Sequence, residues 1–268
     1  MTAENKAHPS SFLRQPSTRV GALFARLKRE RRCGLIAYLT CGDGDTGAHV
    51  KELEEAGADA IELGIPFSDP IADGPVIQAA AQRALANGTT TKHVFEIARK
   101  IRETSEIPLI AFSYLNPVTR YGATRFAQEA NEAGIDSVLL TDLPPEAAKE
   151  VRDAMHAQKL GTVFLLAPTS TDARIKAIDK ASDGFVYYVS TTGVTGTRSE
   201  LDPSLLTRLD EVRAKLKHPI AVGFGISKHE HYEMLRERCD AIVVGSAIVR
   251  AISEGRNPGS VVRTILGR

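Results

Sequence analysis

The chain has 268 residues, 43% of them hydrophobic, which suffices to bury the core of one large domain such as an α/β barrel. Its 34 Lys and Arg balance 33 Asp and Glu, so overall charge gives no reason to expect nucleic acid or an anionic membrane as partner. No stretch approaches the roughly 20 apolar residues of a membrane-spanning helix. Three cysteines, Cys33, Cys41 and Cys239, without a CxxC pair predict a reduced, cytoplasmic protein.

Residues 1–18 are polar and predict a flexible tail, and residues 19–268, which contain no linker or break in composition, predict a single domain. Within that domain, short apolar runs alternate with longer charged stretches, the pattern of parallel βα units. The predicted strands are Leu35–Thr40, Ala60–Leu63, Leu109–Phe112, Ser137–Leu140, Thr162–Leu166, Phe185–Val189, Ile220–Gly223 and Ala241–Val244. The predicted helices are Gly47–Ala56, Val76–Ala86, Lys92–Ser105, Thr124–Ala133, Pro145–Gln158, Asp172–Ala181, Pro203–Lys217, Lys228–Arg238 and Ala247–Glu254.

Eight strands with crossover helices favour a closed (β/α)8 barrel, the TIM barrel. Counting strands does not show closure, so an open doubly wound sheet stays an alternative. Asp172 and Ser227 are expected to cap helix starts, and Gly57, Gly88 and Gly134 to end helices. Loops rich in Gly, Pro and acids follow the strands, so we expect them to meet at the C-terminal rim, the edge where the carboxyl ends of the strands lie.

Two acids stand out near this rim. Glu62 lies in an apolar strand, and Asp73 lies in the Gly- and Pro-rich loop that follows. A carboxylate in a buried strand is costly unless it is paired or its pKa shifts, which makes it a candidate for proton transfer. The alternatives are a structural ion pair for Glu62 and a helix cap at Pro75 for Asp73.

The stretch Gly42–Gly47 is a literal GxGxxG between a strand and a helix, with Glu62 twenty residues beyond Gly42. This is the dinucleotide-binding pattern, and alone it suggests an NAD-dependent oxidoreductase. Asp43 and Asp45, however, place two carboxylates where a pyrophosphate needs bare N–H donors. A simple turn is therefore the favoured interpretation.

Small-residue turns follow the last two predicted strands, at Gly223–Ser227 and Gly245–Val249. They allow close backbone approach and offer N–H donors, as a barrel phosphate site requires, although turns that only relieve crowding are the alternative. Gly193–Gly196, with a glycine at each end, is typical of a mobile loop that closes the same pocket, and a merely disordered loop is the alternative. His229 and His231 are spaced i, i+2, which on a helix separates the rings, so we expect no metal site.

These segments together resemble the tryptophan synthase alpha subunit, in order, from about residue 20 to 250. The matching motifs are Glu62–Gly64 through Asp69–Pro70, Ala72–Pro75, Tyr114–Pro117, Asp142–Pro144, Gly193–Gly196, Gly223–Ser227 and Gly245–Val249. Ala37 and Gly44 replace prolines that are usual in the family, which puts local loop geometry in doubt but leaves the matched catalytic positions intact.

The resemblance implies a (β/α)8 lyase that cleaves indole-3-glycerol phosphate to indole and glyceraldehyde 3-phosphate in tryptophan biosynthesis, without metal or organic cofactor in this chain. Glu62 matches the catalytic acid/base, and Asp73 matches the acid that accepts a hydrogen bond from the indole N–H. Tyr187 matches a tyrosine near the glutamate, and Thr195 matches the threonine of the closing loop. Phosphate is expected at Gly196, Phe224, Gly225, Gly245 and Ser246, and indole among Tyr38, Phe112, Leu139 and Leu165.

The resemblance also implies a partner, the pyridoxal-phosphate-containing beta subunit, in an αββα complex through which indole passes directly. Pro66, Asp69, Asn116 and Pro144 match the contact loops. A stand-alone lyase that releases free indole remains the closest alternative, and a non-enzymatic phosphate-binding module is a more distant one.

Overall fold

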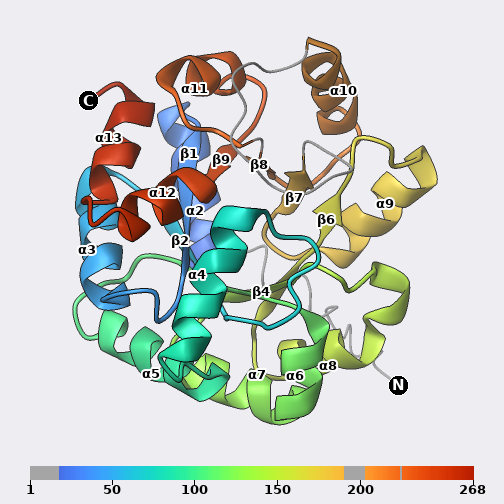
Figure 1. The fold of residues 1–268 in the computed structure, drawn as a ribbon. Helices are drawn as coiled ribbons and strands as arrows, with labels where there is room; N and C mark the ends of the chain where they lie inside the picture. Colours follow the sequence, from blue (N-terminus) through green and yellow to red (C-terminus); the bar gives the residue numbers. More distant parts are fainter. Residues whose placement is uncertain (1–17, 190–202, 224) are drawn as a thin grey trace, which may run out of the picture.

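A ring of parallel strands surrounded by helices forms the molecule (Figure 1). The computed structural model describes residues 18–189, 203–223 and 225–268. The predicted tail therefore falls almost wholly outside the described residues. The strands are β1 (Gly34–Thr40), β2 (Ala60–Gly64), β3 (Leu109–Ser113), β4 (Ser137–Leu140), β5 (Gly161–Val163), β6 (Leu165–Leu166), β7 (Val186–Val189), β8 (Ile220–Gly223) and β9 (Ala241–Val244).

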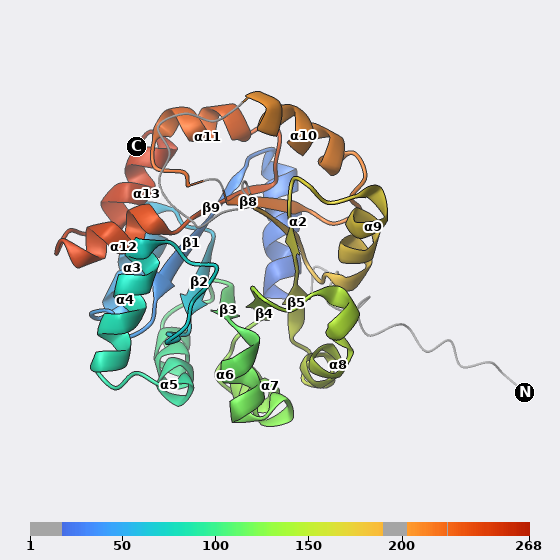
Figure 2. The ribbon, with the colours of Figure 1, turned by 45° about the vertical axis from the view of Figure 1, so that its right-hand side comes forward.

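Helices surround these strands, the first across one end of the ring and the others on its outside (Figure 2). They are α2 (Arg19–Glu30), α3 (Thr46–Ala56), α4 (Pro75–Ala86), α5 (Thr91–Arg102), α6 (Leu115–Tyr121), α7 (Ala123–Glu132), the 3-10 turn η1 (Pro145–Ala147), α8 (Lys149–Ala157), α9 (Asp172–Ala181), α10 (Pro203–Arg213), α11 (His229–Leu235), α12 (Ser246–Ser253) and α13 (Gly259–Leu266). None of the helices within the described ranges is long and apolar enough to span a bilayer.

The sheet closes on itself through its fifth strand. Its order is β5-β4-β3-β2-β1-β9-β8-β7-β6, so the two ends are β5 and β6, which are separated along the chain by Phe164 alone. β5 pairs with β4 and β6 pairs with β7, and the Tyr187 N–H donates to the Phe164 carbonyl at 3.1 Å. β5 and β6 are the two halves of the predicted strand Thr162–Leu166. The (β/α)8 barrel is thus confirmed, and the open sheet is wrong.

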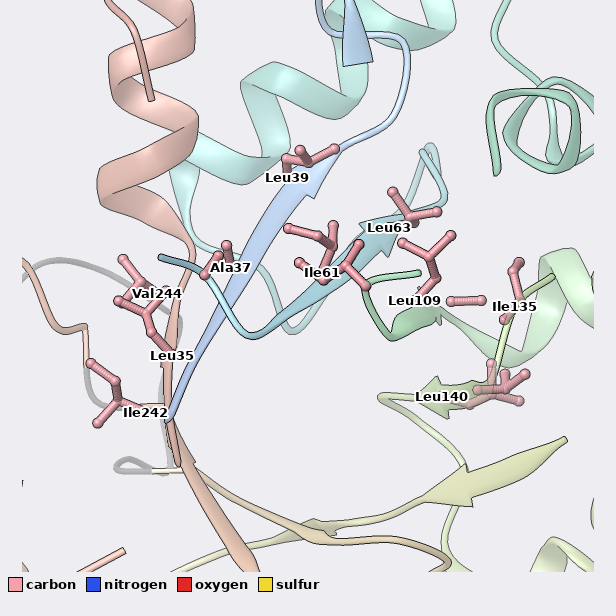
Figure 3. Packing of buried hydrophobic residues seen from close by; sticks show 14 of the residues in the cluster. Leu35, Ala37, Leu39, Ile61, Leu63, Leu109, Ile135, Leu140, Ile242 and Val244 are labelled. Atoms are coloured by element: carbon pink, nitrogen blue, oxygen red, sulfur yellow. The ribbon is translucent and has the colours of Figure 1, made fainter. Parts of the chain in front are cut away.

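Alternation along each strand divides the core in two. Side chains facing outward pack beneath the helices, as Figure 3 shows for Leu35, Ala37 and Leu39 of β1 and for Ile61 and Leu63 of β2. Side chains facing inward fill the barrel, and those buried in one cluster include Ile36, Ala60, Ile110, Leu139, Val163, Ala221 and Ala241. Successive residues of each strand therefore point alternately toward the helices and into the barrel.

Helix α2, which we did not predict, covers the N-terminal ends of the strands. Its buried side chains recur at helical spacing and join the inward cluster: Val20, Leu23, Phe24 and Leu27. The ring of Phe24 lies 5.4 Å from that of Phe185 inside the barrel. Among the described residues, α2 therefore seals this end of the barrel interior, and a ligand would reach that interior from the C-terminal rim.

Other differences from the prediction are local. Helices α6 and α13 were missed, and the predicted helix Pro145–Gln158 is divided into η1 and α8. Thr171, not Asp172, caps α9, and no side chain caps α11, so Ser227 is not a cap. Gly57 does end α3 at φ 107°, while Gly88 and Gly134 follow the caps of α4 and α7 with φ near 78° and 79°.

Candidate active site

Glu62 points into the barrel from the middle of β2. It pairs in register with Tyr38 of β1 and Ile110 of β3, and it is 0% exposed. Neither carboxyl oxygen has a hydrogen-bond partner among the described residues. Burial raises the pKa of Glu62 to about 8, because the charged form loses its hydration. The structural ion pair considered for Glu62 is therefore wrong for the part of the chain described, and its carboxyl is protonated near neutral pH.

Asp73 reaches the same interior from the loop between β2 and α4. It is 6% exposed, and burial raises the pKa of this carboxyl to about 6, although a hydrogen bond from Tyr114 opposes the rise. The Tyr114 hydroxyl donates to Asp73 Oδ2 at 3.0 Å. Helix α4 begins after its N-cap Gly74 with no side-chain cap, and within the described ranges the Asp73 carboxylate accepts from Tyr114 and from no N–H of α4, so the capping role considered for Asp73 is wrong there.

Tyr114 is a functional candidate that sequence reasoning missed. It follows β3 directly and is 3% exposed. Its hydroxyl accepts the Ala72 N–H at 3.0 Å while donating to Asp73, so it holds both the backbone and the side chain of the Asp73 loop. The available signal was a tyrosine directly after a strand, at the rim where Asp73 also lies.

The four residues expected to hold indole line this interior. Tyr38 and Phe112 meet edge to face, with ring centroids 5.1 Å apart and planes at 74°. Leu139 is fully buried in the inward cluster, and Phe112 and Leu165 are half-buried against it. A flat apolar group therefore has aromatic and aliphatic surface to contact beside the two acids.

Tyr187 faces the interior from β7. A Cβ atom at Gly223 would lie 2.5 Å from its hydroxyl, so the neighbouring strand needs a glycine there. Burial, and then the charges of Glu62 and Asp73, raise the pKa of Tyr187 well above its usual value, which keeps the hydroxyl neutral. It makes no hydrogen bond to Glu62 in this structure.

The expected phosphate residues are partly described. Gly225 has φ +65°, Gly245 precedes α12, and Ser246 opens that helix and is 8% exposed. Val249 of α12 packs with Tyr38, which places this helix beside the pocket. Helix starts offer free N–H donors to an anion. Thr195, Gly196 and Phe224 lie outside the described residues.

The residues expected to contact a partner differ in exposure. Asp69 and Pro144 are exposed on the loops that follow β2 and β4, and Asn116 is exposed in the first turn of α6, which follows β3, whereas Pro66 is buried and presents little surface. The Leu115 N–H donates to Asp142 Oδ1 at 2.7 Å, which links the start of α6 to the loop after β4. Ile71 in the same region is 79% exposed.

The GxGxxG turn holds an internal ion pair where a cofactor phosphate would have to lie. Arg83 of α4 forms a bidentate salt bridge with Asp43, in which Nε donates to Oδ1 and Nη2 donates to Oδ2, both at 2.7 Å. A Cβ atom at Gly42 would come within 1.9 Å of the Thr89 hydroxyl, so this glycine serves close packing. This geometry favours the simple turn over a nucleotide site.

Two large hollows that the described residues line lie away from Glu62 and Asp73. They have volumes of about 440 and 580 Å³ and flank α2 at the sealed end of the barrel. Arg19, which lines both, is paired with Glu106 and Asp136. Over the described ranges, no group of three His, Cys, Asp or Glu side chains is arranged to hold a metal ion.

Comparison with known proteins gives one consistent result. Residues 24–265 match the family model for the tryptophan synthase alpha chain. The chain is 57% identical over 240 residues to the tryptophan synthase alpha chain of Solibacter usitatus, covering 88% of this chain and 90% of that one. It is 46% identical over 236 residues to that of Citrifermentans bemidjiense, covering 87% and 88%.

Solved structures agree with the sequence comparison. Tryptophan synthase subunit alpha from Legionella pneumophila superposes with a TM-score of 0.85 at 36% identity, covering 92% of this chain and 97% of that one. A structure of the tryptophan synthase α2β2 complex from Pyrococcus furiosus gives 0.82 at 41% identity, covering 88% and 98%. The chain belongs to the tryptophan synthase alpha chain family, and it is an enzyme of tryptophan biosynthesis.

Proposed function

We propose that this chain cleaves indole-3-glycerol phosphate to indole and glyceraldehyde 3-phosphate, a retro-aldol reaction that needs no cofactor in this chain. The observation that carries the proposal is a fully buried carboxyl, Glu62, whose pKa of about 8 keeps it protonated, in one interior with Asp73. Such a group both gives and takes a proton near neutral pH.

Glu62 performs the two proton transfers. Its carboxyl proton goes to C3 of the indole ring, and the ring becomes an indolenine-like cation. The resulting carboxylate then takes the proton from the glycerol hydroxyl. The bond between C3 and the side-chain carbon breaks, its electron pair returns to the ring, and an aldehyde forms. Glu62 is protonated again at the end, so the reaction is balanced without a metal.

Asp73 stabilises the cation. As a carboxylate it accepts a hydrogen bond from the indole N–H, where positive charge develops after C3 is protonated. Its pKa of about 6 leaves it mostly ionised at pH 7 while Glu62 is mostly neutral. The bond from Tyr114 holds Asp73 Oδ2 in place, which leaves Oδ1 for the substrate.

The remaining residues bind and enclose the substrate. Indole lies among Tyr38, Phe112, Leu139 and Leu165, and phosphate lies at Gly225, Gly245 and Ser246 together with Gly196 and Phe224. Thr195 belongs to the loop that closes over the site. The neutral Tyr187 hydroxyl orients the Glu62 carboxyl when substrate displaces solvent from the pocket.

A beta subunit is the proposed partner, in an αββα complex that carries pyridoxal phosphate on the beta chain. Two observations support it: a structural neighbour is an α2β2 complex, and the segments after β2, β3 and β4 expose Asp69, Asn116 and Pro144 on the rim where Asp73 lies. Indole would pass from this rim to the partner. The single barrel of residues 19–268 and the tail of residues 1–18 remain our proposed division of the chain.

Indole release in a single turnover tests the proposal. We expect Glu62→Gln to abolish cleavage and Asp73→Asn to retain only a small fraction of it, while both variants still bind substrate. Wild-type turnover by Glu62→Gln would refute the mechanism. Strong stimulation by added beta subunit would identify the complex, and an equally fast reaction without it would identify the stand-alone lyase.

A further inference from the structure

Two of the three cysteines lie together at the end of the barrel opposite the active site. Cys33 directly precedes β1, and Cys239 stands two residues before β9, yet their sulfur atoms are 3.6 Å apart. β1 and β9 are neighbours in the sheet, and the Gly34 N–H donates to the Asp240 carbonyl at 2.9 Å between the two cysteines. The fold thus places in contact two thiols that are 206 positions apart in the sequence.

Both cysteines are buried, and hydrogen bonds hold the Cys239 sulfur and the Cys33 backbone. Cys33 and Cys239 are 2% and 3% exposed. Cys239 Sγ donates to the Leu235 carbonyl at 3.3 Å, and the Tyr232 hydroxyl donates to the Cys33 carbonyl at 3.3 Å. A disulfide needs the sulfurs to approach to about 2.05 Å, and thiols that already touch reach that distance by side-chain rotation more easily than distant ones.

Cys41 differs from this pair. It is fully buried at the opposite end of β1, with no neighbouring thiol among the described residues. Burial raises the pKa of its thiol well above the usual value, and the hydrogen bond with Cys33, followed by burial, raises the pKa of Cys239 in the same direction. Cys41 is therefore distinguished from the pair by its lack of a thiol contact and not by its pKa. The chain therefore contains its own internal control, a third buried cysteine without a partner.

We propose that Cys33 and Cys239 are a reversible disulfide site that hydrogen peroxide closes. One sulfur attacks peroxide and becomes a sulfenic acid with release of water, and the other displaces the second oxygen as water. Overall, two thiols and one peroxide give one disulfide and two waters, so the thiols lose two electrons and two protons that the peroxide accepts. A dithiol reductant reverses the reaction.

Closing this bond joins the start of the first strand to the start of the last. Most of the barrel then lies within one covalent loop, which limits the freedom of the unfolded chain. The site is at the sealed end, beside the C-terminal end of α2, whereas Glu62 and Asp73 face the open rim. Oxidation should therefore raise the thermal stability without changing the cleavage activity, so the disulfide would stabilise the fold under oxidative stress.

Mass spectrometry of the whole folded protein tests this. The protein is exposed to peroxide, alkylated after denaturation and compared with an untreated sample. We expect two fewer alkylated thiols and a loss of two hydrogens, both restored by dithiothreitol. Cys33 and Cys41 share one tryptic peptide, because no Lys or Arg lies between Arg32 and Lys51, so chymotrypsin, which cuts after Tyr38, is used to locate the link.

Variants complete the test. Cys41→Ser should form the link at the wild-type rate, whereas Cys33→Ser and Cys239→Ser should not form it. The oxidised wild type should melt on the order of 5–10 °C higher than the reduced form, and its indole release should stay unchanged. A link involving Cys41, a sulfinic acid at Cys33 in place of a link, or a link that forms only in urea would overturn the proposal.

Discussion

The buried carboxyl of Glu62 lowers the stability of the folded chain at neutral pH, although the proposed reaction requires it. Its pKa is about 8 in the folded chain against an ordinary value of 4.5, so the unfolded state alone loses the proton between these pH values. Stability therefore falls as pH rises from 4.5 to 8 and then levels off. At pH 7 we expect the free energy of unfolding of Glu62→Gln to exceed that of wild type by about 3 kcal/mol, measured by urea unfolding.

The same comparison at pH 4 provides the control. Glu62 is then mostly protonated in both the folded and the unfolded state, so folding has no protonation cost for glutamine to remove, and the two proteins should have nearly equal stability. Equal stability at both pH values would show that Glu62 is solvated or paired in solution.

Asp73 and Glu62 together predict a bell-shaped pH profile for kcat/KM. The reaction needs Asp73 ionised, so activity should fall below about pH 6, and it needs Glu62 protonated, so activity should fall above about pH 8. Indole release measured between pH 5 and 9.5 checks both limbs. In Asp73→Asn the acid limb should disappear while the alkaline limb stays, and a profile that keeps both limbs would contradict the assignment.

At the residue scale, sequence predicted the acids but not their partners. An acid in an apolar strand and another in a Gly- and Pro-rich loop are visible patterns, so Glu62 and Asp73 were found. Tyr114 was missed because its role depends on where its hydroxyl lies, 41 positions away from the carboxyl that it holds. Such a contact follows from the parallel pairing of β2 with β3, which brings the segments after both strands together, and not from any local pattern.

At the scale of elements, Arg83 and Asp43 join α4 to the turn after β1. Asp43 is 7% exposed, so a lost guanidinium leaves a nearly buried carboxylate without its bidentate partner. Because the Arg83 side chain is 43% exposed, solvent screens part of the cost. We expect Arg83→Gln to lower the free energy of unfolding by about 1–2 kcal/mol.

Arg83→Lys should lie between wild type and Arg83→Gln, since lysine keeps the charge and loses the bidentate geometry. Arg213→Gln is the matched control, because Arg213 and Asp240 are 39% and 32% exposed in their side chains. That substitution should cost less than about 0.5 kcal/mol in urea unfolding. A similar loss of unfolding free energy at both sites would show that the bidentate geometry of Arg83 and Asp43 adds no stability.

Helix α2 predicts a stability effect without an effect on activity. Phe24→Ala removes a ring that is 7% exposed and packs on Phe185 within the sealed end. We expect a loss of about 3–4 kcal/mol in urea unfolding and normal indole release while the protein stays folded. Leu85→Ala, at an exposed position of α4, should change little by comparison. A large fall in activity of folded Phe24→Ala would connect the sealed end to the chemistry.

Sequence contained a signal for α2 that we did not use. Val20, Leu23, Phe24 and Leu27 have the i, i+3, i+4, i+7 spacing of an amphipathic helix, but the helix precedes the first strand and has no place in a βα repeat. Strand positions were predicted to within about one residue because the apolar runs are short and bounded by Gly or Pro. Helix ends were less certain, as the division into η1 and α8 shows.

For the whole molecule, closure was the step that sequence did not decide. Eight strands fit an open sheet or a barrel equally well, and the pairing of β5 with β4 and of β6 with β7 distinguishes them. The parallel pairing of β2 with β3 brings the segments that follow them to one rim, and this explains why Asp73 and the exposed contact residues are neighbours.

The proposed complex predicts that one apolar side chain on this rim contributes to assembly. Ile71 is 79% exposed beside the loop residues Ser68 and Asp69, and burying an isoleucine against a partner contributes about 1.5–3 kcal/mol. Ile71→Ser should therefore weaken the affinity for the beta subunit about tenfold or more, measured by calorimetry. Met234→Ser changes an exposed methionine on α11 and should leave the affinity unchanged. If both variants bound the beta subunit as tightly as wild type, the rim around Ile71 would not be the contact surface.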